Sequence, residues 1–328
     1  MLRKISKLTF LVQVLIYFGL LALLWVPAIL HPHQPIHLAS EGPFYTWLTN
    51  IISNHDSVSV SIALIIVILL SIVLYFLGSG NDIVPRENFL PAIFYILLLS
   101  WNPQLTVMNP TLPAALFVIL AISTLMRLYG EPEPFRQVFM VAVFVGMASL
   151  FYLPSVYLMF MVWITLITYR VTSWREWIIA LLGFLVPFIY LFSWYFWNDE
   201  FIKGSNVIIN AIDDPGLSIK ELTMNEAVWV IATGFMLILS MLAFYNVIQD
   251  KLISIRRKSL VLINFVIATI LMMFMSGSPL VMLVQWVYLP LAILTVINIC
   301  LVKRSIVMDW MVLVYFIYLL CIRFFFLT

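Results

Sequence analysis

Charged residues are scarce in this chain of 328 residues, because Asp, Glu, Lys and Arg together make up only 10% of it. A soluble domain of this length would contain about a quarter charged residues and roughly half apolar ones, whereas here 64% of the residues are hydrophobic. The net charge is only +2, which gives nucleic acid little electrostatic reason to bind. The composition therefore excludes an ordinary soluble domain and predicts a membrane protein.

Cysteine is equally rare, since the chain contains only Cys300 and Cys321. The two residues lie in the last two apolar runs, which are expected to cross the membrane in opposite directions. They would then lie near opposite faces, beyond the reach of a disulfide. The chain also lacks a cleavage site of the Ala-x-Ala kind after its first apolar run, which is too long for a signal-peptide core. We therefore predict an uncleaved first span.

Two features of transporters are missing as well. No inverted repeat with matched broken helices, the arrangement that many transporters use, is found in the sequence. No series of carboxylates crosses the apolar runs, although proton- or ion-coupled transport normally needs one. These absences count against a coupled transporter, and a lipid translocase would need a continuous polar path that the sequence does not obviously supply.

What the chain does contain is a succession of apolar runs. About 20 helical residues, at 1.5 Å each, cross a hydrocarbon core of about 30 Å. On this criterion we predict an all-α, polytopic transmembrane bundle of about 11 spans. The spans are expected at residues 8–30, 58–77, 88–101, 111–127, 137–152, 154–169, 177–197, 227–248, 259–276, 279–301 and 309–327. The third and fourth form either two full crossings or one re-entrant pair.

The basic residues predict the orientation of these spans. All but three of the 17 Lys and Arg residues fall on one side if the spans alternate in direction; the exceptions are Lys203, Lys220 and Arg323. Since cytoplasmic loops are enriched in Lys and Arg, the N-terminus is predicted inside and the C-terminus outside.

Two outer connections are long in this topology, residues 31–57 and 198–226. We therefore divide the chain into a core at 1–200, which includes the first outer loop, and a segment at 201–328. The second segment combines the second outer loop with a C-terminal bundle of four spans. Any chemistry outside the lipid is expected in the two long loops.

Local signals mark several span ends. Ser173, followed three residues later by Glu176, is a capping-box pattern at the start of the seventh span. In the second outer loop, residues 201–212 are amphipathic and are followed by the turn signal Asp213-Asp214-Pro215-Gly216. Tryptophan, an interfacial anchor, gathers at span ends; examples are Trp47, Trp101, Trp174, Trp177, Trp194 and Trp197.

The first outer loop concentrates titratable groups. The stretch HPHQPIHLASEGPFYTWLTNIISNHD, residues 31–56, holds Glu41, Asp56 and every histidine of the chain, namely His31, His33, His37 and His55. Glu41 is either a general base near the membrane surface or a solvated acid favoured by the dipole of a short helix. The histidines would bind a metal ion, hold a phosphate, or simply be solvated in a proline-rich loop.

The three exceptional cations are candidates for binding a phosphate. Arg323 lies 14 residues after Asp309, so a helix would place it about 21 Å into a core of about 30 Å, where a charge must be paired or snorkel to the interface. Lys203 and Lys220 lie in the second outer loop. Each is either a ligand for a lipid-borne phosphate or an ordinary surface cation.

Three stretches together resemble a known family. They are RENFLPAIFYILLLS (86–100), FVGMASLFYLPSVYLMF (144–160) and SWREWIIALLGFLVPFIYLF (173–192). They resemble an uncharacterised family of multi-pass inner-membrane proteins of Gram-negative bacteria, and the resemblance covers roughly residues 1–200. It implies a location in the bacterial inner membrane.

The overall layout is also similar to the GT-C superfamily of glycosyltransferases, which use lipid-linked sugars. Those enzymes begin inside and carry an acidic residue in the first outer loop, often followed by a Tyr and a short interfacial helix. A core of about seven spans and a longer outer loop follow. Here Glu41-Gly42-Pro43-Phe44-Tyr45 occupies that place.

This resemblance implies transfer of a sugar, such as mannose, from a polyprenyl-phosphate carrier to an acceptor hydroxyl at the periplasmic face. The acceptor would belong to a protein or a glycan, and no obligatory metal or other cofactor is expected. Glu41 would be the base and Asp56 a second carboxylate, and the groups that contact the substrate would be Arg323, Lys203, Lys220, His37, His55 and Tyr45. The alternatives are a non-catalytic membrane subunit of an envelope complex, bound to a partner membrane protein, and a lipid or glycolipid translocase.

Overall fold

The structure is a computed structural model, and it describes residues 6, 8–52, 56–81, 83–85, 87–171, 173–212, 223–249, 251–301 and 306–321. Some helical side chains, that of Lys203 among them, are not part of the description. Throughout these ranges the regular elements are helices. One isolated β-bridge pairs Glu41 with Tyr152. The predicted all-α class is confirmed.

Every predicted apolar run contains a helix. The elements are α2 (Phe10–Leu30), α3 (Pro43–Ile52), α4 (Asp56–Gly80), α5 (Leu90–Leu99), η1 (Pro103–Thr106), α6 (Thr111–Leu128), α7 (Phe135–Phe151), η2 (Leu153–Leu158), α8 (Met159–Thr168), α9 (Trp174–Trp197), α10 (Phe201–Ile212), α11 (Met224–Ile248), α12 (Ile253–Met275), α13 (Leu280–Leu301) and α14 (Ile306–Cys321). Within the described ranges, seven of them are long and apolar enough to cross a membrane, namely α2, α4, α6, α9, α11, α12 and α13. The chain is thus a multi-pass helical membrane protein with seven helices of spanning length, where the sequence predicts about eleven spans.

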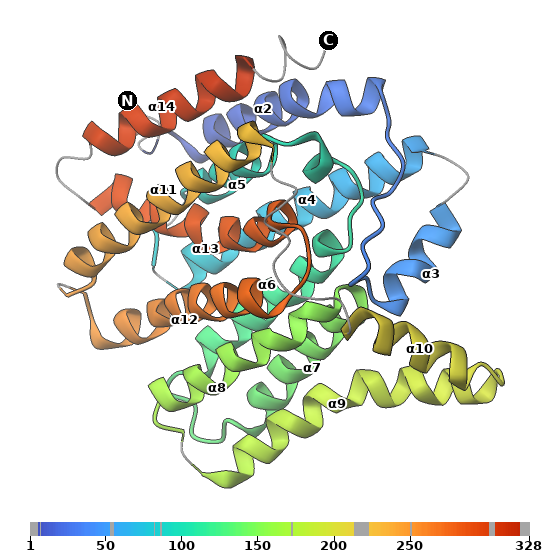
Figure 1. Cartoon of the computed structure of the whole chain (residues 1–328). Helices are drawn as coiled ribbons and strands as arrows, with labels where there is room; N and C mark the ends of the chain where they lie inside the picture. The colour runs from blue at the N-terminus through green and yellow to red at the C-terminus, as the bar shows by residue number, and fades with distance from the viewer. Residues whose placement is uncertain are drawn as a thin grey trace.

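Helices α13 and α5 form the centre of the bundle (Figure 1). All ten residues of α5 are buried, and 94% of the apolar stretch of α13 is buried too. Helix α13 packs against α5, α6, α11 and α12, so helices from the predicted segments 1–200 and 201–328 share one core. Helix α9 lies at the periphery and exposes large apolar side chains such as Leu182 and Ile189, which is the surface expected against lipid.

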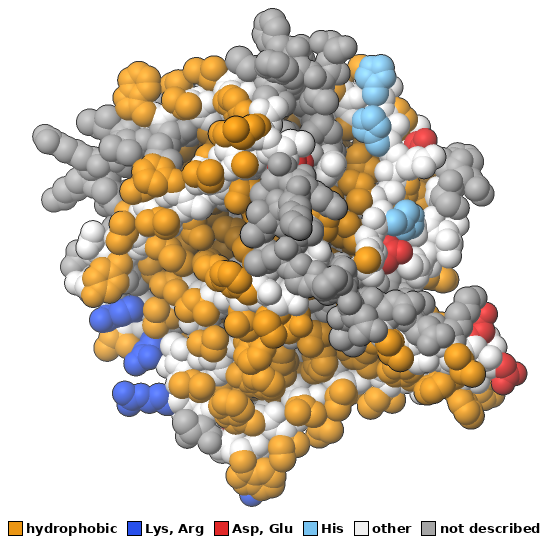
Figure 2. Space-filling model, in the orientation of Figure 1, with side chains coloured by type: hydrophobic (Ala, Val, Ile, Leu, Met, Phe, Trp, Pro, Cys, Tyr) orange, Lys and Arg blue, Asp and Glu red, His pale blue; other side chains and the backbone are white. Residues whose placement is uncertain are grey.

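The connections gather at two opposite ends of the bundle. One, the histidine end, contains residues 31–42 and 276–279, where Ser40 Oγ lies 2.6 Å from Ser278 Oγ. The other, the basic end, contains the last turn of α6 and the first turns of α12, where Arg257 donates a hydrogen bond of 2.8 Å to the carbonyl of Thr168. Figure 2 shows Lys and Arg side chains where α12 begins, and His, Asp and Glu side chains at the opposite end.

Residues 88–110 pass from one end of the bundle to the other. The N–H of Phe89 donates to Oε1 of Gln13 (2.7 Å), near the start of α2, whereas the carbonyl of Met108 accepts from the N–H of Ile36 (2.9 Å), beyond the end of α2. Residues 88–110 therefore extend along the length of α2. The chain after α5 is largely non-helical, which is tolerated at membrane depth when the backbone is buried in protein.

The capping signals are only partly confirmed. Helix α9 begins at Trp174 with Ser173 as its N-cap, but the Ser173 side chain makes no capping hydrogen bond. The Oε2 atom of Glu176 is buried and has no hydrogen-bond partner among the described residues. A complete capping box instead opens α11, where the Thr223 hydroxyl accepts from the N–H of Glu226 and the Glu226 carboxylate accepts from that of Thr223. That box satisfies backbone donors at the helix start.

Glycine allows α7 and α9 to approach each other closely. A Cβ atom added to Gly146 of α7 would lie 2.6 Å from the carbonyl oxygen of Phe184, and one added to Gly183 of α9 would lie 2.7 Å from that of Phe139. Both distances are too short for real carbon–oxygen contacts. Small residues at such crossings are typical of helix pairs in membranes, where close packing replaces the hydrophobic effect. The crossing fixes the place of α9, which lines the cavity described below.

Replacing Gly183 by Ala is expected to destabilise the protein by about 1–3 kcal/mol, because overpacking at this contact outweighs the higher helix propensity of Ala, about 1 kcal/mol. Gly19→Ala is the matched control, since a Cβ at Gly19 would meet nothing within 4 Å. Thermal unfolding of both variants in detergent measures the effect. An unfolding midpoint of Gly183→Ala equal to or above that of Gly19→Ala would contradict the proposed packing.

Candidate functional site

The first loop is held in place by backbone pairing with the end of α7. The N–H of Gly42 donates to the carbonyl of Phe151 (2.9 Å), and the N–H of Leu153 donates to the carbonyl of Ser40 (3.1 Å). Between these bonds, Glu41 and Tyr152 form the antiparallel bridge. A Cβ atom at position 42 would collide with the carbonyl of Leu150, so this close approach requires glycine.

Tyr45, in the first turn of α3, ties the same loop to residues 103–110. Its side chain is fully buried, and its hydroxyl donates to the carbonyls of Ile36 (2.8 Å) and Met108 (3.0 Å). Burial, and secondly the negative charge of Glu41, raise the pKa of the Tyr45 phenol well above its usual range, so it stays a neutral donor. With its hydroxyl bonded to these two carbonyls, Tyr45 holds the loop in place.

Glu41 and His37 form a close pair in this loop. His37 Nδ1 lies 3.0 Å from one carboxylate oxygen of Glu41 and 3.3 Å from the other, and the N–H of Leu38 donates to that carboxylate at 3.4 Å. The Glu41 side chain is 15% exposed, while that of His37 is 58% exposed. An ionised carboxylate can only accept, so the contact is a hydrogen bond when Nδ1 of His37 carries a proton; in a neutral ring of that tautomer, Nε2 is the acceptor.

The other predicted site residues are only partly placed. Asp56 is the first residue of α4, where the helix dipole favours a carboxylate, and no contact among the described residues joins it to Glu41. Lys203 lies in α10, but its side chain is outside the description. His55, Lys220 and Arg323 also lie outside the described residues. The structure therefore brings together Glu41, His37 and Tyr45.

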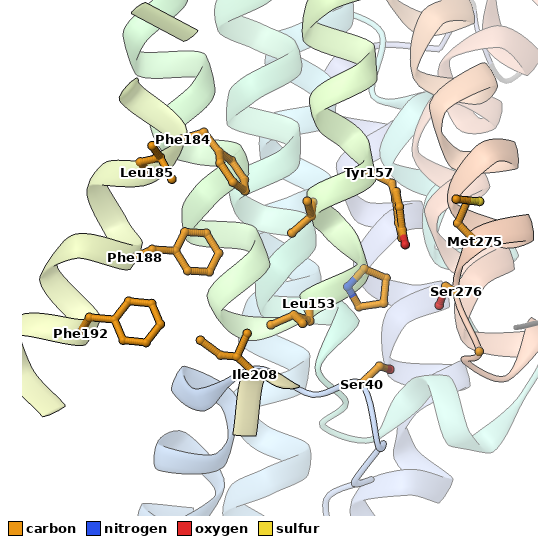
Figure 3. A pocket seen from close by; sticks show the side chains of 13 residues that line it. Ser40, Leu153, Tyr157, Phe184, Leu185, Phe188, Phe192, Ile208, Met275 and Ser276 are labelled. Atoms are coloured by element: carbon orange, nitrogen blue, oxygen red, sulfur yellow. The ribbon is translucent and has the colours of Figure 1, made fainter. Parts of the chain in front are cut away.

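An apolar cavity of about 410 Å³ lies next to this loop (Figure 3). Phe184, Phe188 and Phe192 of α9 line one side of it, and Tyr157 and Met275 lie on the other. Its volume falls in the range of about 300–1,000 Å³ that is usual for sites of small molecules. An apolar cavity beside the lipid-facing helix α9 is suited to a hydrocarbon chain.

Two hydroxyl groups form a polar edge of this cavity at the histidine end. They belong to Ser40 and Ser276, which line the cavity together with Leu153. Glu41 and His37 are not among the residues that line the cavity. Ser40, the residue before Glu41, links the Glu41–His37 pair to the edge of the cavity along the chain.

The sequence analysis missed the cavity, although its pattern contains a signal for it. Phe184, Phe188 and Phe192 are spaced four residues apart, which places them on one face of a helix. The pairing of Ser40 with Ser278 has no such signal, because it joins residues that are 238 positions apart.

No group of three or more His, Cys, Asp or Glu side chains that could hold a metal ion is found in the described part of the chain. Comparison with protein-family models, with curated proteins and with solved structures found no match for this chain. The site is therefore interpreted from its own geometry.

Replacing Tyr45 by Phe is expected to lower the free energy of unfolding by about 1–3 kcal/mol, because two buried carbonyls lose their shared donor. Tyr190→Phe is the matched control, since the Tyr190 side chain is 73% exposed. Chemical or thermal denaturation of the full chain in detergent measures the difference. Equal stability of the two variants would show that Tyr45 does not hold the loop.

Proposed function

We propose that this protein is an integral membrane glycosyltransferase that moves a sugar from a polyprenyl-phosphate carrier to an acceptor hydroxyl. The observation that carries the proposal is the 3.0 Å contact between His37 and Glu41, in a loop whose residue Ser40 lines an apolar cavity. The reaction needs a proton acceptor near the headgroups and an apolar site for the isoprenoid chain. The Glu41–His37 pair would be that proton acceptor, and the cavity lined by Ser40 would be that apolar site.

In the proposed reaction the acceptor oxygen attacks the anomeric carbon of the sugar. The bond between that carbon and the phosphate oxygen breaks, and the polyprenyl phosphate leaves with the electron pair. The acceptor's proton passes to the Glu41–His37 pair, in which Glu41 orients the imidazole and Nε2 of His37 takes the proton. A positioned base contributes about 10²–10⁴ to the rate.

The leaving phosphate needs hydrogen-bond donors and positive charge, which stabilise it as the bond breaks. The hydroxyls of Ser40 and Ser276 at the edge of the cavity are suited to donate to it. The predicted cations Lys203, Lys220 and Arg323, together with His55, would supply the charge, and Asp56 remains a second carboxylate. The isoprenoid chain would lie against the phenylalanines of α9.

The proposal includes a topology. The basic end would face the cytoplasm, as the positive-inside rule requires, and the histidine end would face the periplasm of a bacterial inner membrane. The N-terminus would then lie inside and the C-terminus outside. Residues 88–110, helix α7, the η2–α8 segment and α14 would add to the seven long helices to give the eleven crossings of a GT-C-like bundle.

The test is a transfer assay with the purified full chain, polyprenyl-phosphate mannose and other polyprenyl-phosphate sugars as donors, and membrane extracts as the source of acceptors. Release of polyprenyl phosphate is measured. Glu41→Gln is expected to lower the rate by about 10²-fold or more, because the pair loses its charge. Glu133→Gln, at an exposed position beyond α6, is the control and should keep the wild-type rate.

Two results would contradict the proposal. One is release by Glu41→Gln at the wild-type rate. The other is a wild-type protein that releases no polyprenyl phosphate from any of these donors, which would favour the non-catalytic subunit of an envelope complex.

A further inference from the structure

Arg127, in the last turn of α6, lies between two cavities at the basic end of the bundle. One cavity has a volume of about 420 Å³ and the other about 380 Å³. Both are lined by Arg127, Ser123 and Leu120, so they are neighbouring spaces that share one wall. This region lies at the opposite end from the Glu41–His37 pair.

Each cavity has a second cation of its own. Arg136, in the first turn of α7, lines the larger cavity, and Lys258 of α12 lines the smaller one. Within the described ranges, none of these three cations forms an ion pair with a carboxylate, although Glu131 also lines the larger cavity. Arginine presents a fork of N–H donors that matches the oxygens of a phosphate. The three cations thus form two adjacent places for a phosphate, with Arg127 common to both.

Apolar side chains form part of the wall of each cavity. Phe76 of α4 lines the smaller cavity, and Met140 and Phe144 of α7 line the larger. Phe76 is 63% exposed and Met140 is 41% exposed, and both belong to apolar helices. Cations with apolar side chains beside them favour an amphiphile with its phosphate at the membrane surface over a soluble anion.

We propose that this surface binds an anionic phospholipid with two phosphodiester groups, one in each cavity, with Arg127 between them. The acyl chains would lie along Phe76 and Met140. Basic pockets between membrane helices are known to bind headgroups of this kind. The proposal does not depend on the transferase function, because it concerns the other end of the molecule and a different set of residues.

Basic residues are expected at a cytoplasmic end in any case, so the test must separate a site from a general surface charge. Arg256 provides the control, because it is exposed, lies two residues before Lys258 on α12, and lines neither cavity. Arg256→Gln changes the net charge by as much as Arg127→Gln does. Arg127→Lys keeps the charge, so lipid binding that persists in this variant shows that a substitution at position 127 does not by itself unfold the protein.

The experiment measures binding of lipids to the detergent-purified full chain by native mass spectrometry. The probes are cardiolipin, which has two phosphodiesters, phosphatidylglycerol, which has one, phosphatidylcholine, and inorganic pyrophosphate as a soluble source of phosphate. We expect cardiolipin to bind more tightly than phosphatidylglycerol. Arg136→Gln and Lys258→Gln should each weaken cardiolipin about fivefold, the effect of one cation near a charged headgroup, and Arg127→Gln should weaken it more.

Arg256→Gln should bind cardiolipin as the wild type does, and Arg127→Lys should bind it more weakly than the wild type but more tightly than Arg127→Gln, because it keeps the charge and loses the guanidinium fork. Equal losses in Arg256→Gln and Arg127→Gln would overturn the proposal, since only general charge would then matter. Equal affinity for cardiolipin and phosphatidylcholine would overturn it as well. Displacement of cardiolipin by pyrophosphate at similar concentrations would show that the site takes a soluble phosphate compound and not a lipid.

Discussion

The arrangement of the histidine end depends on the short backbone pairing between residues 40–42 and 151–153. Its two N–H···O bonds and the Glu41–Tyr152 bridge join the loop after the first helix to the end of α7. At this pairing Ser40 lines the apolar cavity, and the next residue, Glu41, contacts His37. Gly42 permits it, because any side chain there would meet the carbonyl of Leu150. If this pairing were lost, the Glu41–His37 pair would no longer be held at a fixed position relative to the cavity.

The molecule separates its chemistry between two ends. An apolar cavity and His side chains lie at one end, and Arg and Lys side chains lie at the other (Figure 2). The bundle between them is largely apolar, and buried polar groups found there hold neighbouring helices together. An example is Asn264, which donates to the Thr165 hydroxyl at 3.1 Å and joins α12 to α8. Interhelical bonds of this kind satisfy groups that lipid cannot.

Hydropathy and local signals were sufficient to predict the helical class, the positions of the helices and several of their ends. Residues 201–212 form the expected amphipathic helix α10, because a local period decides such elements. Over the residues that the structure describes, seven of the eleven predicted spans are helices of spanning length. Helix α5 is instead a short helix buried on all sides, and an apolar run alone does not distinguish burial in protein from burial in lipid. The Glu41–His37 contact could not be predicted, because it depends on the shape of the loop. Gly42 and Tyr45 fix that shape through partners more than 60 positions away. Contacts at such distances leave no local pattern in a single sequence.

The central claim is that the histidine end positions a polyprenyl-phosphate donor between the apolar cavity and the Glu41–His37 pair. The most direct measurement is a cryo-electron microscopy structure of the protein with a polyprenyl-phosphate sugar bound. The account predicts hydrocarbon density against Phe184, Phe188 and Phe192, the phosphate beside Ser40, and the sugar within reach of His37. An empty cavity, with the lipid bound elsewhere on the bundle, would contradict it.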